Sequence, residues 1–245
     1  MAHLADGKPA QPARPRRATS LVGVGRGTTV KYAAGSRPRR GRGTIAGVAT
    51  TATTRLARAD DAAQVQAIYA PIVRDTAISF EAEPPDVAEV RRRIEGTLTT
   101  LPWLVRERDG EVLGYAYATP HRDRLAYQWS VEVSVYVAPH ARGAGVGRSL
   151  YLPLLDLLAV QGLVNAYAGI TLPNPASVGL HQALGFTPVG VYRESGFKEG
   201  AWRDVGWWQR RLRDLAVPPA APSALPAMPA TVVQSALAAG GPAAR

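Results

Sequence analysis

The chain of 245 residues contains no cysteine. Disulfide bonds, thiolate metal ligands and a cysteine nucleophile are therefore excluded for this sequence. It also lacks the run of about 18 apolar residues that a membrane-spanning helix needs. The four histidines are scattered and show no metal-ligand spacing. We therefore expect no metal, no membrane association and a cytoplasmic location.

Acidic residues are nearly missing from the first part of the chain. Residues 1–54 hold ten Lys or Arg but only one acid, Asp6, whereas residues 55–244 hold 18 basic and 18 acidic residues. Almost all of the net charge of +10 therefore lies in residues 1–54. A folded nucleic-acid-binding domain usually carries such charge on its own surface. Nucleic-acid binding through the basic segment is kept as an alternative function.

Composition divides the chain into three parts. Residues 1–53 lack apolar periodicity and are predicted to be a disordered basic extension, whether a targeting segment, a linker or a start site placed too far upstream. Residues 216–245 are rich in Ala and Pro and are predicted to be a disordered tail. The folded domain is expected over residues 54–215.

Within that domain, alternating and helical apolar patterns predict a mixed α/β fold with a mostly antiparallel central sheet flanked by helices. Asp109-Gly110 is a hairpin signal, and Pro153 is expected to kink or weaken the helix that contains it. Strands are expected at 54–59, 103–108, 111–119, 130–137, 163–170, 187–193 and 202–212, and helices at 61–74, 86–101, 146–161 and 175–184.

A glycine-rich loop, Arg142-Gly143-Ala144-Gly145-Val146-Gly147-Arg148, separates the expected strand 130–137 from the helix that follows. Glycines allow positive φ angles and close approach of a ligand, and backbone N–H groups at a helix start attract an anion. Both the P-loop and the dinucleotide fingerprint require glycine where Arg148 stands. The loop therefore predicts a pyrophosphate site of another kind.

A second motif lies downstream, where Asn174, Ser177 and His181 share one helical face. The helix should end at Leu184-Gly185-Phe186, with glycine as its C-cap. Together with Arg142-x-x-Gly145-x-Gly147, this motif resembles the cofactor site of the GNAT acetyltransferase superfamily. His181 stands where that superfamily commonly has a tyrosine.

Further strings narrow the resemblance to the phosphinothricin N-acetyltransferase family. They are Pro102-Trp103-Leu104-Val105, the run from Ala126 to Val137, Leu172-Pro173-Asn174-Pro175, Gly196-Phe197-Lys198, Trp202 and the run from Asp204 to Gln209. The resemblance implies a GNAT-like acyl-CoA N-acyltransferase fold, acetyl-CoA as co-substrate and a homodimer. It also implies acetylation of phosphinothricin or a similar glutamate analogue such as methionine sulfoximine, as in herbicide or antibiotic detoxification. The alternative substrate is another amino acid or a peptide amine.

The resemblance also implies roles for individual residues. Glu132 and His181 would be the catalytic pair, and Phe80, Arg122, Arg124 and Tyr127 would bind substrate. Acetyl-CoA would be bound by Val135, Tyr136, Val137, Arg142, Gly143, Ala144, Gly145, Val146, Gly147, Arg148 and Asn174. Arg122 stands where a lysine is common and Thr171 where a glycine is usual, so the fine specificity is left open.

Strand alternation puts Glu132, Ser134 and Tyr136 on one face and the valines on the other. An amino-acid amine is mostly protonated at pH 7, so a base must remove its proton, and a carboxylate flanked by valines suits that task. The acyl oxygen would accept a hydrogen bond from the backbone N–H of Tyr136 or Val137. The residues alone do not divide the acid and base duties between Glu132 and His181.

Overall fold

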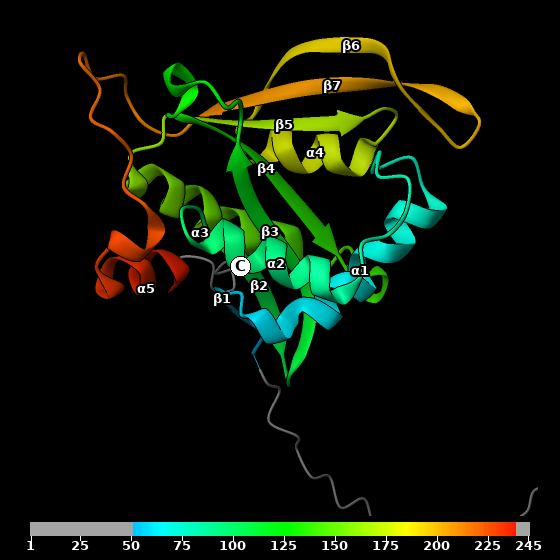
Figure 1. Ribbon diagram of the computed structural model, residues 1–245, viewed down its shortest axis with the longest axis horizontal. Coiled ribbons are helices and arrows are strands. Elements are labelled where there is room, and N and C mark those ends of the chain that lie inside the picture. Colours follow the sequence, from blue (N-terminus) through cyan, green and yellow to red (C-terminus); the bar gives the residue numbers. More distant parts are fainter. Residues whose placement is uncertain (1–50, 239–245) are drawn as a thin grey trace, which may run out of the picture. The chain divides into compact units, whose positions relative to one another are not determined.

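Seven strands form one open sheet in the order β1-β2-β3-β4-β5-β7-β6 (Figure 1). The computed structural model describes residues 51–238, so the basic extension before residue 51, and nucleic-acid binding through it, lie outside the described residues. Among the described strands only β4 and β5 pair in parallel, which confirms the mixed, mostly antiparallel sheet. The strands are β1 (Thr53–Leu56), β2 (Trp103–Arg108), β3 (Glu111–Pro120), β4 (Ser130–Val137), β5 (Asn165–Thr171), β6 (Thr187–Lys198) and β7 (Ala201–Arg211).

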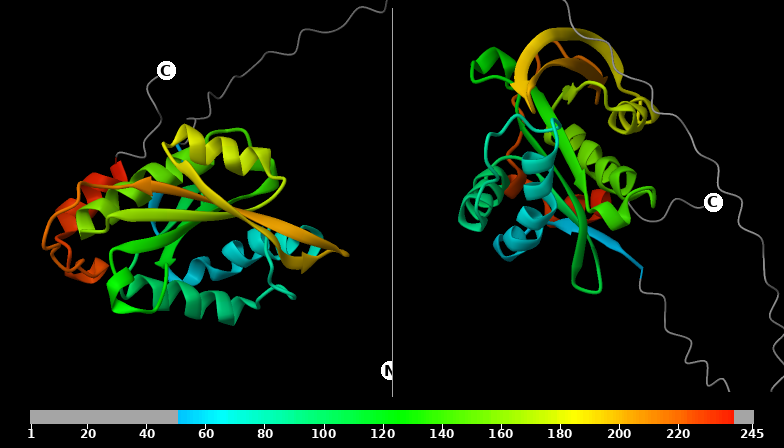
Figure 2. Two further views of the ribbon diagram at one scale, coloured as in Figure 1. Left: turned by 90° about the horizontal axis from the view of Figure 1, so that it is seen from above. Right: turned by 90° about the vertical axis from the view of Figure 1, so that its right-hand side faces the viewer.

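Helices cover both faces of this sheet (Figure 2). On one face lie α1 (Ala62–Asp75) and α2 (Val87–Leu98), and on the other α3 (Val146–Gln161) and α4 (Pro175–Ala183). Local signals set their ends. The Asp86 side chain accepts a hydrogen bond from the Glu89 N–H at 2.6 Å and so caps α2, while Gly162 ends α3 with φ 97°.

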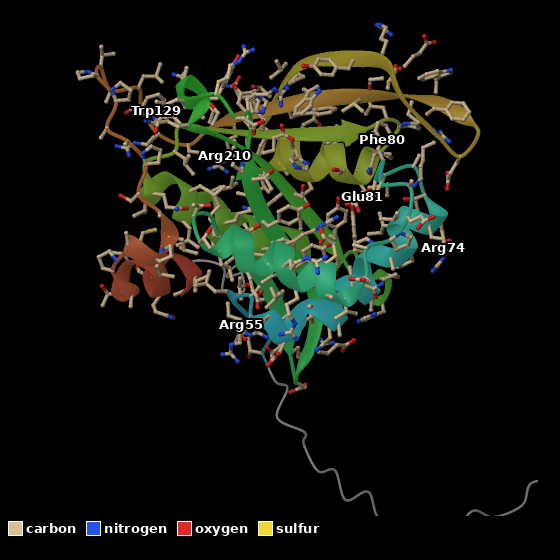
Figure 3. The ribbon with its side chains drawn as sticks, viewed as in Figure 1. Arg55, Arg74, Phe80, Glu81, Trp129 and Arg210 are labelled. Carbon is tan, nitrogen blue, oxygen red and sulfur yellow. The ribbon has the colours of Figure 1, made fainter. Side chains whose placement is uncertain are left out.

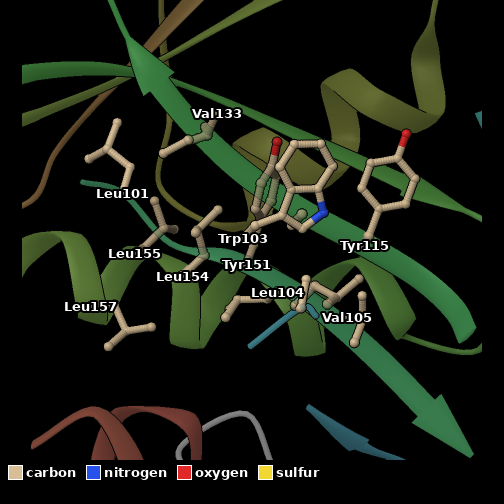
Figure 4. Close-up of a cluster of buried hydrophobic side chains, with 14 of the residues drawn as sticks. Leu101, Trp103, Leu104, Val105, Tyr115, Val133, Tyr151, Leu154, Leu155 and Leu157 are labelled. Carbon is tan, nitrogen blue, oxygen red and sulfur yellow. The ribbon is translucent and has the colours of Figure 1, made fainter. Parts of the chain in front are cut away.

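Part of the hydrophobic core lies between α3 and the sheet (Figure 4), and buried side chains of α1 and α2 belong to the same cluster. Leu150, Leu154 and Leu158 of α3 have no exposed surface and pack into the same cluster as Leu104 of β2. The helix runs unbroken through the buried Pro153. Burial of this leucine-rich face stabilises the helix enough to offset the hydrogen bond that proline cannot donate.

The structure differs from the sequence prediction after residue 216. This part of the chain forms a 3-10 turn (Leu225–Ala227) and helix α5 (Ala230–Ala238), and α5 packs against α3 and β1, so a disordered tail is wrong for these residues. The prediction of disorder relied on the many alanines and prolines of this segment. The segment is nevertheless folded, because Leu225, Val233 and Leu237 are buried.

Two polar anchors fix the path of this C-terminal segment. The Gln161 side-chain amide donates to the carbonyls of Thr100 and Ser223 at 2.8 and 2.9 Å. The Trp129 indole N–H donates to the Ala220 carbonyl at 2.7 Å, at the upper left of Figure 3. These bonds hold the segment beside the start of β4.

The β6–β7 hairpin is longer than the sequence predicted and reaches the loop between α1 and α2. Near its tip, Lys198 Nζ donates to the backbone carbonyls of Val73 and Glu81 at 2.8 and 2.5 Å. Phe80, which Figure 3 labels in that loop, lies against Gly196, where an added Cβ would meet the Phe80 ring at 2.2 Å. Glycine at 196 therefore allows the loop and the hairpin to pack closely.

Leu225→Ala tests whether the C-terminal segment belongs to the core. Leu225 is 6% exposed, so we expect the free energy of unfolding to fall by about 2–5 kcal/mol, measured by urea denaturation. Leu215→Ala is the matched control, because Leu215 is 62% exposed and its loss should change that free energy by less than about 0.5 kcal/mol. Equal effects of the two substitutions would contradict the packing.

Candidate active site

The parallel strands β4 and β5 pair over only three residues and then separate. Their register runs from Ser130 opposite Asn165 to Glu132 opposite Tyr167. Beyond Glu132, β4 stays paired with β3, while β5 stays paired with β7 (Figure 1). The sheet therefore opens into a wedge directly after Glu132.

Backbone groups of β4 face this wedge. The bonds His121 N–H to Ser130 carbonyl and Ala138 N–H to Leu113 carbonyl show that the even-numbered residues of β4 direct their N–H and C=O groups to β3. The odd-numbered Val135 and Val137 therefore direct theirs into the wedge. Tyr136 directs its N–H to β3, so of the two groups expected to polarise an acyl oxygen only Val137 is suitably directed.

The glycine loop closes the wide end of the wedge. Gly143 and Gly145 both have φ 77°, which L side chains rarely adopt, and Gly145 is the N-cap of α3. A cavity of about 440 Å³, the glycine-loop cavity, lies between this loop, β4 and α4. Ala144 is the one expected cofactor residue outside its lining, and those within it are Val135, Tyr136, Val137, Arg142, Gly143, Gly145, Val146, Gly147, Arg148 and Asn174.

His181 lies deeper, in a cavity of about 60 Å³ that also includes Ser134 and Tyr151. It is only 3% exposed. Its Nδ1 lies 2.8 Å from the Ser177 carbonyl, which can only accept, so Nδ1 carries the hydrogen. Nε2 then accepts from the Tyr151 hydroxyl at 3.1 Å.

Burial shapes the protonation of this pair. Desolvation lowers the pKa of His181, opposed in part by its hydrogen bond to Ser177, so the imidazole is neutral at pH 7. Burial raises the pKa of the Tyr151 hydroxyl above its usual range, so this group keeps its hydrogen. His181 is thus a neutral acceptor within a buried polar pair.

Glu132 lies at the narrow end of the wedge and is more accessible, with 32% of its side chain exposed. Its Oε1 accepts from His121 Nδ1 and from the Arg122 guanidinium, each at 3.0 Å. It shares a face of β4 with Ser134, which is one two-residue step, about 7 Å, along the strand and lines the His181 cavity. A carboxylate and a buried imidazole therefore flank the opening from two sides.

The four residues expected to bind substrate do not all lie in one site. Arg122 contacts Glu132 and lies over the Trp207 ring at 5.9 Å, and Tyr127 lies edge-on to His121 at 6.0 Å. Arg124 lines a cavity of about 470 Å³ together with Arg122, Tyr127 and the segment Pro222–Ala224. Phe80 instead packs on the hairpin at Gly196. The structure thus brings Arg122 to Glu132 and Tyr127 to the neighbouring His121, whereas Phe80 packs elsewhere.

Sequence reasoning missed two residues of this site. Tyr151 stands among the leucines of α3 and was indistinguishable from a core residue. His121 was not identified as a partner of Glu132, because nothing in the local pattern pairs the two residues. The signal for His121 was the β3–β4 register, which sets Thr119 opposite Glu132 and so puts the end of β3 beside that carboxylate.

Among residues 51–238, no cluster of His, Asp and Glu could hold a metal ion. No helix in this same range is long and apolar enough to cross a membrane.

Comparison with known proteins gives the family. The model of the Acetyltransferase (GNAT) domain family matches residues 54–207. The phosphinothricin N-acetyltransferase of Alcaligenes faecalis is 47% identical over 162 residues, covering 65% of this chain and 82% of that protein. The methionine sulfoximine/methionine sulfone acetyltransferase of Salmonella typhimurium is 36% identical over 69% of this chain and 99% of that protein.

A solved structure agrees with this family. The phosphinothricin acetyltransferase of Sinorhizobium meliloti, in complex with acetyl-CoA, superimposes with a TM-score of 0.63 at 37% identity, covering 66% of this chain and 88% of that one. The resemblance expected from the sequence is confirmed: the chain is an N-acetyltransferase of the GNAT superfamily and belongs to the phosphinothricin N-acetyltransferase family.

Proposed function

We propose that this protein transfers the acetyl group of acetyl-CoA to the amine of a small amino acid, phosphinothricin or a similar glutamate analogue such as methionine sulfoximine. The observation that carries the proposal is the wedge between β4 and β5. It joins the glycine loop at one end to an accessible carboxylate, Glu132, at the other. Transfer of an acyl group from a phosphorylated carrier to an amine needs a site for the phosphates and a base for the amine along one opening.

The chain's own groups fit acetyl-CoA, which supplies an activated thioester when bound. Backbone N–H groups at the start of α3 suit a pyrophosphate, because the helix dipole favours negative charge there. Arg142 and Arg148 add positive charge at the same cavity. The wedge-facing backbone of Val135 and Val137 can pair with an extended amide-bearing chain as a strand would. The Val137 N–H can then stabilise charge that develops on an acyl oxygen.

Glu132 is the proposed base. Its Oε1 is held by the guanidinium of Arg122 at 3.0 Å. One N–H bond of the protonated amine breaks, the proton passes to Glu132, directly or through a water, and the nitrogen lone pair becomes free to attack. The C–N bond then forms and the C–S bond breaks, and the surplus proton on nitrogen ends on the departing sulfur, so that the products are the amide and the thiol.

His181 is assigned a different duty, since its buried, neutral imidazole is poorly suited to take a proton from an amine. It orients Tyr151, whose hydroxyl can turn its hydrogen from His181 Nε2 toward a sulfur in the same cavity. A hydrogen bond to the departing thiolate stabilises its charge.

Recognition of the amino acid's anionic groups is assigned to Arg122 and Arg124, with Tyr127 beside them. The alternative substrate for the same reaction is another amino acid or a peptide amine. The similarity to phosphinothricin and methionine sulfoximine acetyltransferases supports the small-molecule substrate. Detoxification of such a substrate in the cytoplasm stays a prediction.

A homodimer is proposed from the β6–β7 hairpin. Apolar side chains stay exposed along β6 and at the hairpin's end, where Phe197 and Trp202 pack edge to face at 5.5 Å. These residues are Val189, Val191, Tyr192, Phe197 and Trp202. Contiguous apolar surface of this kind is usually covered by a partner. A second copy of the chain is the proposed partner.

The catalytic assignment predicts unequal effects of two substitutions. Glu132→Gln should lower kcat/KM by about 10²–10⁴-fold, because it removes the base. His181→Ala should lower it by about 10–100-fold, because it removes one hydrogen bond to Tyr151. Thiol release measured at saturating acetyl-CoA would test both, with the surface substitution His140→Ala as control. Unchanged rates in Glu132→Gln would refute the base.

The substrate assignment predicts that phosphinothricin and methionine sulfoximine are acetylated with higher kcat/KM than other amino acids or short peptides. A panel of these amines, followed by thiol release and by mass spectrometry of the acetylated product, measures this directly. Turnover of peptides or other amino acids without turnover of the two glutamate analogues would favour the rival substrate class.

The dimer predicts that the wild-type protein sediments at twice the mass of one chain, and that Trp202→Glu converts it to a monomer. A charge on this apolar surface would be buried unpaired in the interface, which is costly. Sedimentation velocity measures the mass, and Leu215→Glu, at an exposed site off the hairpin, is the control. A wild-type monomer would contradict the dimer.

A further inference from the structure

His121 is held rigidly at the entrance of the wedge. It follows β3 directly, and its backbone N–H donates to the Ser130 carbonyl at 3.1 Å. Its ring stacks on Tyr167 of β5 with centroids 4.4 Å apart and planes 19° apart. Its edges meet the rings of Tyr127 and Trp207, each at 6.0 Å. Contacts from three other elements therefore fix the orientation of this imidazole.

That orientation aims one nitrogen at the proposed base. His121 Nδ1 lies 3.0 Å from Glu132 Oε1, and a carboxylate can only accept, so Nδ1 carries the hydrogen. Arg122 donates to the same oxygen at 3.0 Å. Within residues 51–238, the hydrogen bonds to this carboxylate all end on Oε1, so Oε2 is available.

We propose that His121 is a positioning residue of the acetyl transfer: it locks Oε1 of Glu132 so that Oε2 faces the substrate amine. The proposal rests on the proposed function, in which Glu132 takes the amine proton. The N–H bond of the amine breaks, the O–H bond forms at Oε2, and the lone pair stays on nitrogen for the attack on the thioester.

The ring of His121 lies among aromatic side chains. Around the ring, β5 contributes Tyr167, β7 contributes Trp207 and the 3-10 turn Leu125–Tyr127 contributes Tyr127. The charged groups beside it include Glu132 and Arg122, which share a hydrogen bond at Oε1. Aromatic packing therefore holds the ring, and its Nδ1 provides the polar contact through which it can act on Glu132.

The test compares kcat and the KM for acetyl-CoA in three variants. His121→Phe keeps a ring for the stacking on Tyr167 but removes the N–H donor. His121→Asn keeps a donor at the position of Nδ1. His140→Asn is the matched control, because His140 also pairs with a glutamate, Glu111, at 3.0 Å, but at the surface.

His121→Phe should lower kcat by about tenfold with KM for acetyl-CoA unchanged, because it removes one hydrogen bond that orients the carboxylate of Glu132. His121→Asn and His140→Asn should keep the wild-type kcat. An unchanged kcat in His121→Phe, or an equal loss in His121→Asn, would overturn the proposal.

A second measurement needs no change at position 121. In the wild-type protein, a downfield proton resonance of His121 Nδ1–H should move upfield in Glu132→Gln, since an amide oxygen accepts more weakly than a carboxylate. A resonance that stays in place overturns the pairing. The two ideas fail separately: full activity of Glu132→Gln refutes the base itself, whereas an inactive Glu132→Gln with an unchanged kcat in His121→Phe refutes only the role of His121.

Discussion

The site depends on one constraint in the sheet, the parallel pairing of β4 with β5 that ends at Glu132 and Tyr167. A longer ladder would use the hydrogen-bonding groups of Val135 and Val137 within the protein. Because the strands separate, those groups face a wedge. The same separation lets α4 and the start of α3 approach the opening, so one break in the ladder creates both the binding surface and the entrance.

Two different environments result on the two sides of the break. Glu132 is partly exposed, and its Oε1 accepts hydrogen bonds from Arg122 and His121. His181 is buried, and its neutral form satisfies both ring nitrogens through Ser177 and Tyr151. Exposure to solvent thus distinguishes an accessible carboxylate from a buried hydrogen-bonding pair, a difference that the residue types alone could not supply.

The sequence predicted those parts of the molecule that depend on local chemistry. Strands β2 and β4 and helix α3 begin and end at the residues that alternation and helical periodicity indicated, and Asp109 and Gly110 adopt the positive φ angles of the predicted turn. The glycine loop could likewise be predicted, since positive φ angles and the start of a helix depend on local sequence.

Contacts between segments far apart in the sequence could not be predicted in this way. The pairing of His121 with Glu132 needs the register of two strands, and the contact of Tyr151 with His181 needs the docking of α4 on α3. The segment after residue 216 shows the same limit, because its few apolar side chains are decisive only once α3 and β1 are in place.

The C-terminal segment has a practical consequence for how this protein is divided into parts. The family match ends at residue 207, yet Pro222–Ala224 form a wall of the cavity that holds Arg124 and Tyr127. A fragment trimmed to the family boundary would take the Ala220 carbonyl from the Trp129 indole and the Ser223 carbonyl from the Gln161 amide, which would keep Thr100 as a partner. The folded unit is therefore larger than the region that the family model matches, and variation beyond that region can alter the cavity beside Arg124 and Tyr127 without touching the shared fold.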